Sequence, residues 1–189
     1  MAKASPLRSE LAEGRNALAL GRVCALTERF LAEPRQTDRL IEFLWDDDEG
    51  VASRAADVLE RVTRDGSQTG RRIFAHSKDA LLGLIPEARP KKLRWNLALM
   101  VGRFPLTPEE ARRVGKVLES WLNDASSIVK TAALQGLADL TRHDPAALPG
   151  VLDLLRIQGR SGTPAMRARS RILLSKLEKR SARDGNAAS

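Results

Sequence analysis

Hydrophobic residues recur along the chain with the spacing of an α-helix. In the segment VKTAALQGL, residues 129–137, a large apolar residue is followed by a small or apolar residue four positions later and by leucine eight positions later. Residues at these spacings lie on one side of an α-helix. The same pattern begins at Val51, Leu93 and Met166. No stretch of useful length alternates between apolar and polar residues, so the pattern predicts helices without a β-sheet.

These four helical segments repeat at a nearly constant interval. Their first residues are separated by 42, 36 and 37 positions. Each is preceded by another helical segment, at residues 37–45, 77–85, 107–122 and 144–157. Helical segments that recur every ~35–45 residues are typical of solenoids, in which helix pairs stack on one another. The core positions of the second helices are expected to be buried, namely Ala55, Leu59, Leu97, Val101, Ala133, Leu134, Leu137 and Leu174.

Residues that begin and end helices support these boundaries. Thr107 is followed by Pro108 and Glu110, a combination that forms a capping box at the start of a helix. Thr37 is the expected N-cap of the helix at 37–45, and Pro86 is expected to stop the helix at 77–85.

The repeats predict one domain over residues 1–180. An irregular helix pair at 1–35 caps the stack. Four repeats follow, at 37–65, 71–104, 107–143 and 144–180, and residues 181–189 are expected to form a disordered tail.

The segment WLNDASSIVKTAALQGL, residues 121–137, resembles a HEAT repeat. That family has an aspartate in the turn within the repeat and a basic residue six positions later, which here are Asp124 and Lys130. Arg94 and Arg167 hold the matching basic position in two neighbouring repeats. The resemblance implies an all-α fold, a right-handed α-α superhelix (solenoid) of about five antiparallel helix pairs. It also implies a ladder of hydrogen bonds between repeats, formed by Asp124, Lys130 and Arg94.

Candidate chemistry is sparse. The only cysteine, Cys24, excludes an internal disulfide and is expected to be a buried apolar residue. His76 and His143 belong to no metal-ligand pattern, and the acidic run at 46–50 is expected to be a turn. No apolar run reaches the ~18 residues of a membrane span. We therefore expect a cytoplasmic monomer that is not an enzyme and has no catalytic residues, metal or cofactor.

The sides of the second helices that face away from the core suggest where a partner binds. In HEAT arrays this side lines the concave surface, and we expect it to hold a protein or peptide partner. The candidate contacts are the apolar residues Trp95, Leu99 and Ile172 and the polar residues Asp57, Glu60 and Gln135. Burial of Trp95 against an adjacent helix is the alternative, whereas Trp45 and Trp121 are expected to pack at helix corners.

A net charge of +8 supports a second hypothesis. The C-terminal helix is strongly basic, and Arg167, Arg171 and Lys179 are candidate phosphate contacts. Under this alternative the protein is a nucleic-acid binder related in architecture to the alkylpurine DNA glycosylases, whose fold is also HEAT-like. A solvated polar cap at the end of the repeats would explain the same residues without any ligand.

Overall fold

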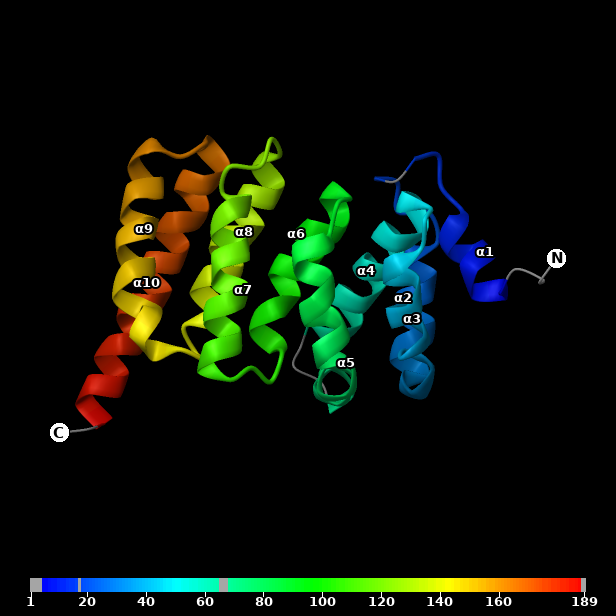
Figure 1. Cartoon of the computed structure of the whole chain (residues 1–189), viewed down its shortest axis with the longest axis horizontal. Coiled ribbons are helices and arrows are strands. Elements are labelled where there is room, and N and C mark those ends of the chain that lie inside the picture. The colour runs from blue at the N-terminus through cyan, green and yellow to red at the C-terminus, as the bar shows by residue number, and fades with distance from the viewer. Residues whose placement is uncertain (1–4, 17, 65–67, 188–189) are drawn as a thin grey trace. The chain divides into compact units, whose positions relative to one another are not determined.

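A computed structural model of the chain describes residues 5–16, 18–64 and 68–187. Over these residues it contains ten α-helices, joined by turns and short 3-10 segments, and no β-strand. Within each of the two compact parts of the chain, helices pack side by side (Figure 1). The prediction of an all-α fold built from antiparallel helix pairs is confirmed. Where one domain was expected over 1–180, the chain divides into two compact units, Met1–Pro105 (unit 1) and Leu106–Ser189 (unit 2).

Unit 1 is organised around one buried helix. Its helices are α1 (Pro6–Ala12), α2 (Val23–Ala32), α3 (Arg39–Glu42), α4 (Glu49–Thr63), α5 (Gln68–Glu87) and α6 (Lys91–Met100). Helix α4 packs against all five of the others. As a result, every residue of α4 except Glu49 and Arg61 is buried, including polar residues on the side away from the apolar core.

The acidic run at 46–50 is the predicted turn. Asp48 caps α4 by accepting hydrogen bonds from the backbone nitrogens of Gly50 and Val51, at 2.7 and 3.1 Å. Asp46 accepts two hydrogen bonds from the Arg8 guanidinium, at 2.7 and 2.8 Å. These hydrogen bonds lower the pKa of Asp46, despite its partial burial.

Several local predictions for unit 1 are wrong. The helix expected at 37–45 is split into α3 and a 3-10 segment, Phe43–Trp45. Thr37 is not the N-cap of α3, since Asp38 holds that position, and the Thr37 side chain is buried. Trp45, the last residue of that 3-10 segment, is 48% exposed and does not pack at a helix corner as predicted. Cys24 is also exposed, since it follows the buried Val23 on α2 and points away from the core side.

The helix expected at 77–85 is longer at both ends. Helix α5 begins at Gln68 and continues through Pro86 to Glu87. Pro86 therefore does not stop the helix where predicted, although it removes one hydrogen bond from the last turn because proline lacks a backbone N–H.

Unit 2 consists of two regular helix pairs. They are α7 (Pro108–Trp121) with α8 (Ser127–Leu140), and α9 (Leu148–Ser161) with α10 (Pro164–Ala187). The predicted capping box is confirmed, because Thr107 accepts a hydrogen bond from the Glu110 nitrogen at 3.2 Å and Glu110 accepts one from the Thr107 nitrogen at 2.8 Å. Helix α10 continues to Ala187, through most of the segment expected to be a disordered tail.

The predicted core positions are buried with one exception. Leu174 is only half-buried, whereas Met166, Ser170, Leu173 and Leu177 face the interior. Counted from Met166, the buried positions of α10 are therefore four and seven residues later, at Ser170 and Leu173. The position eight residues later, Leu174, was the one predicted. Trp121 is 8% exposed and packs as predicted.

Candidate functional site

The polar side of α4 lies inside unit 1 and not on an open surface. Asp57 and Glu60 were expected to face a partner, but they are only 6% and 4% exposed. Arg54, Asp57, Glu60 and Thr63 follow one another at intervals of three residues, which winds them around about half of the helix circumference. These residues are covered by neighbouring helices, so Asp57 and Glu60 do not lie on an open surface as expected.

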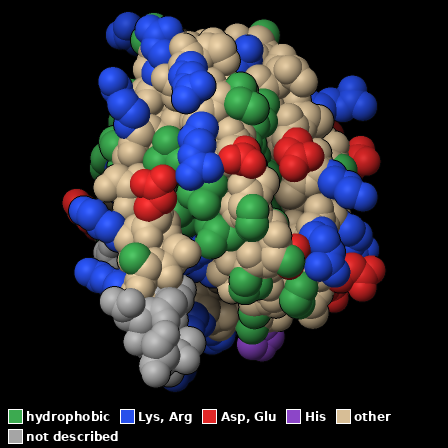
Figure 2. Space-filling model, turned by 90° about the vertical axis from the view of Figure 1, so that its left-hand side faces the viewer, with side chains coloured by type: hydrophobic (Ala, Val, Ile, Leu, Met, Phe, Trp, Pro, Cys, Tyr) green, Lys and Arg blue, Asp and Glu red, His purple; other side chains and the backbone are tan. Residues whose placement is uncertain are grey.

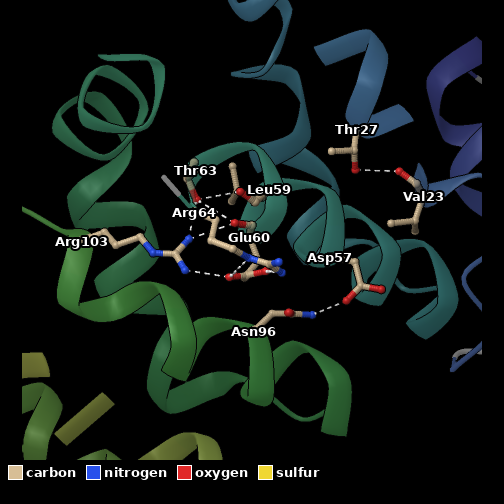
Figure 3. Close-up of polar contacts among 9 residues, drawn as sticks. All are labelled: Val23, Thr27, Asp57, Leu59, Glu60, Thr63, Arg64, Asn96 and Arg103. Carbon is tan, nitrogen blue, oxygen red and sulfur yellow. Dashed lines mark hydrogen bonds and ion pairs between the residues drawn. The ribbon is translucent and has the colours of Figure 1, made fainter. Parts of the chain in front are cut away.

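Asp57 forms a buried ion pair. Its Oδ2 lies 2.5 Å from Nζ of Lys92, whose side chain is 3% exposed. Its Oδ1 accepts a hydrogen bond from Asn96 Nδ2 at 2.8 Å (Figure 3). Lys92 and Asn96 both belong to α6, so this carboxylate joins α4 to the next second helix along the chain.

Glu60 is held between two arginines. Its carboxylate lies 2.7 Å from Nη2 of Arg103 and 2.6 Å from Nη2 of Arg64 (Figure 3). Arg103 also donates to the Glu60 carbonyl and the Thr63 hydroxyl, at 2.9 and 3.1 Å. Burial by itself raises the pKa of Glu60, but the hydrogen bonds and charges of the two arginines outweigh burial and lower it.

Arg54 is the buried arginine of α4. Its guanidinium donates to the backbone carbonyls of Leu11 and Ala12 at the end of α1, and to that of Asn16 in the segment that follows. Carbonyls at a helix C-terminus lack partners within the helix, so a buried arginine satisfies them. Apart from the Glu60–Arg64 pair within α4, the contacts of Arg54, Asp57 and Glu60 reach residues about one repeat away, between 35 and 43 positions. From the sequence, Asp57 and Glu60 were predicted to lie on an exposed surface, and the role of Arg54 was not predicted.

The other sequence-predicted contacts are more accessible. In unit 1, Trp95 and Leu99 are both half-buried on α6. In unit 2, Gln135 is half-buried and donates to Asp139 at 2.5 Å, and Ile172 is 59% exposed. Asp124 accepts a hydrogen bond from the Ser126 nitrogen at 2.7 Å, which confirms its predicted bond to its own turn. The side-chain ladder with Lys130 and Arg94 stays a prediction.

A groove between α8 and α10 is the feature of unit 2 best suited to hold a ligand. We call it the basic groove, and its volume is about 460 Å³. Its floor is apolar, formed by Ala138, Leu173 and Leu177, which are 2–3% exposed. Its polar lining consists of Asp139, Arg142, Lys176, Lys179, Arg180 and Arg183.

The charges of the basic groove are unbalanced. Five cationic side chains line it against one carboxylate. That carboxylate, Asp139, already accepts a hydrogen bond from Gln135 and lies 3.7 Å from Arg142. Arg180 donates to the Thr141 hydroxyl at 2.6 Å, near the end of α8, where cations interact favourably with the helix dipole. The position of Arg180 is therefore explained by its contact with the end of α8. Within the described residues, no such structural contact accounts for Lys176, Lys179 and Arg183.

The three candidate phosphate contacts do not form one site. Lys179 lines the basic groove, whereas Arg167 and Arg171 are exposed on α10 outside the groove lining. Figure 2 shows the face of unit 2 on the side of α9 and α10, where basic side chains are spread around the face and apolar side chains group near its middle. In the sequence, the groove is indicated by basic residues three, four and seven positions after Lys176, a spacing that puts them on one side of a helix.

A second groove lies between α7, α8 and α9, with a volume of about 540 Å³. Its lining is mainly apolar and includes Leu137, Leu140 and Val151. Arg112, at its rim, lies 3.3 Å from Asp144 and is therefore already paired.

Within the described residues, no three His, Cys, Asp or Glu side chains are grouped so that they could hold a metal ion. His76 is exposed and donates from Nδ1 to the Arg72 carbonyl at 2.9 Å. None of the helices in the described part of the chain is both long and apolar enough to cross a membrane.

Comparison with known proteins identifies no family. No protein-family model and no curated protein matches the chain. Among solved structures, the designed armadillo repeat protein YIII(Dq)4CqI is similar over 90% of this chain and 98% of its own, with 13% sequence identity and a TM-score of 0.44.

Proposed function

We propose that this protein is a non-enzymatic interaction module that binds a segment of a partner protein in the basic groove. One observation carries the proposal: an apolar floor about one helical turn long is bordered by exposed cations of α10 that have no acidic partner in the described structure. Pockets with apolar floors and a few placed polar groups are the usual form of binding sites.

The packed core beneath the basic groove suits the binding of a partner segment. Leu173 and Leu177 belong to the core cluster of unit 2, together with Leu134 and Leu155. The groove floor is thus the outer side of a packed core, which holds α8 and α10 at a set separation. A ligand that binds a preformed groove loses less conformational entropy than one that must order it.

The concave-side residues offer a second surface for the same function. Trp95 and Leu99 lie half-buried on α6 of unit 1. Aromatic residues are enriched among the residues that dominate binding energies. If Trp95 is the main anchor, Trp95→Ala weakens partner binding by about 2 kcal/mol or more.

Nucleic-acid binding is the alternative that the charge of α10 favours. Arg167, Arg171, Lys176, Lys179 and Arg183 are all exposed on this helix. A helix with this many cations contacts phosphates without sequence preference, and its affinity falls steeply with salt concentration.

The test is selection of peptides from a displayed random library on the full chain. Selected peptides should bind wild type and lose binding to Lys176→Glu/Lys179→Glu, which reverses two charges in the groove. The matched control is Arg167→Glu/Arg171→Glu, which reverses two charges of the same helix outside the groove and should retain binding. Trp95→Ala serves as the third arm. Failure to select any peptide, or loss only in Trp95→Ala, would overturn the groove as the binding site.

A further inference from the structure

The cations of α10 in the basic groove are spaced to match a helix. Lys176, Lys179, Arg180 and Arg183 stand at positions i, i+3, i+4 and i+7. These residues share one side of α10 and extend over roughly 10 Å of its axis. Their charges therefore recur about once per helical turn, which is the interval at which a partner helix would present acidic side chains.

The floor of the groove selects the class of partner. Leu173 and Leu177 are one turn apart on α10, and Ala138 of α8 lies beside them. A nucleic-acid backbone has no apolar group that would cover such a floor. Proteins that bind single strands stack bases on aromatic side chains, and none of the nine residues that line the groove is aromatic. The floor and rim together favour a peptide with both apolar and acidic residues.

We infer that the basic groove binds an acidic amphipathic α-helix of a partner protein, an inference that rests on the proposed function. Apolar residues of the partner at i, i+3 or i+4, and i+7 cover the floor, as in other helix-in-groove complexes. Acidic residues that flank this stripe pair with Lys176, Lys179 and Arg183. Arg180 is already held by Thr141, so one rim cation is positioned before the partner arrives.

The experiment measures binding of labelled probes to the full chain by fluorescence anisotropy. The first probe is a peptide of about 18 residues with leucines at helical spacing and glutamates on both flanks. The second has the same composition in an order without helical periodicity. The third replaces every glutamate with glutamine. A single-stranded oligonucleotide and a DNA duplex of similar length complete the set.

We expect the acidic amphipathic helix to bind at least about tenfold more tightly than either peptide control. Lys176→Glu/Lys179→Glu should weaken this binding by about tenfold or more, because it replaces two attractions by repulsions. Arg167→Glu/Arg171→Glu should change it by less than about threefold, since the net charge of the protein falls equally but the groove is intact. Circular dichroism of each variant confirms that all remain helical.

The inference and the proposed function fail in different ways. If library peptides bind the groove but the acidic amphipathic helix binds no better than its two controls, the inference is overturned and the proposed function stands. Tighter binding of the DNA duplex than of any peptide, lost equally in both charge-reversal variants, overturns both. Loss of binding between about 50 and 300 mM salt accompanied by preference for the periodic peptide supports the inference, because it requires both charge and apolar contact.

Discussion

Helices α4 and α10 occupy the same position in their respective repeats, yet their outward sides differ. Each is a second helix with polar residues opposite its apolar stripe. In α4 those residues, Asp57 and Glu60 among them, are buried and paired with residues about one repeat away. In α10 polar residues such as Lys176 and Lys179 are exposed and line a groove.

The number of neighbours explains the difference. Helix α4 is enclosed by five other helices of unit 1, whereas α10 packs against α8 and α9 of unit 2. A charge that is enclosed on all sides must be paired, because its desolvation is otherwise costly. A charge on a helix covered from one side stays hydrated and remains available to a ligand. The polar residues of α4 therefore stabilise unit 1, whereas those of α10 are available to bind a ligand of unit 2.

The largest expected effect comes from breaking the buried pair in unit 1. Asp57→Ala leaves Lys92 charged and enclosed, which should lower the free energy of unfolding by about 3–5 kcal/mol. Urea denaturation monitored by circular dichroism gives this value. The double variant Asp57→Leu/Lys92→Met removes both charges and should regain most of the loss. If Asp57→Ala is as stable as wild type, the ion pair makes no contribution.

A comparable loss is expected from the core of unit 2. Leu137→Ala should lower the free energy of unfolding by about 2–5 kcal/mol, the range for truncation of a buried leucine. The matched control is Ile172→Ala on exposed α10, which should change stability by less than about 0.5 kcal/mol. Equal effects of the two substitutions would contradict the repeat frame that places Leu137 inside.

Glu60 should make the free energy of unfolding of unit 1 decrease at low pH. Its folded pKa lies below the ordinary value of 4.5, so its contribution is complete above pH 4.5 and is lost as the pH falls through the lowered pKa. Glu60→Gln should cost about 1.5–3 kcal/mol at neutral pH, the value of hydrogen bonds to a charged group. The free energy of unfolding of Glu60→Gln should also fall less steeply below pH 4.5 than that of the wild type. Unfolding curves at a series of pH values test this, and an unchanged decline would assign the acid sensitivity to other carboxylates.

The capping box of α7 should have a smaller effect. Thr107→Ala removes the side-chain oxygen that accepts from the Glu110 nitrogen, and should cost about 1 kcal/mol. Thermal denaturation measures it, with Thr107→Ser as a control that keeps the hydroxyl. Equal losses in both variants would show that the hydroxyl is not what stabilises the helix start.

The smallest effect is expected for the groove cations. Lys176→Ala/Lys179→Ala should change the free energy of unfolding by less than about 0.5 kcal/mol, because both side chains are exposed and unpaired in the described structure. A loss as large as that of Asp57→Ala would show that α10 carries a structural ladder like that of α4.

The sequence alone determined the helices and much of the core. The spacing of four and eight residues correctly placed Leu59, Leu97 and Leu137 in the interior, because helical periodicity is a local property of the chain. The capping residues Thr107 and Glu110 likewise marked the start of α7, since all atoms of a capping box lie within four consecutive residues.

Only the tertiary structure decided which polar sides of helices are enclosed. Nothing in the local pattern separates Asp57, which is buried against α6, from Lys179, which borders a groove. Both stand opposite an apolar stripe, and their environments depend on which helices from distant parts of the chain pack beside them. The candidate site was therefore missed in the sequence except for Lys179, because a groove is made by two helices and periodicity describes each helix by itself.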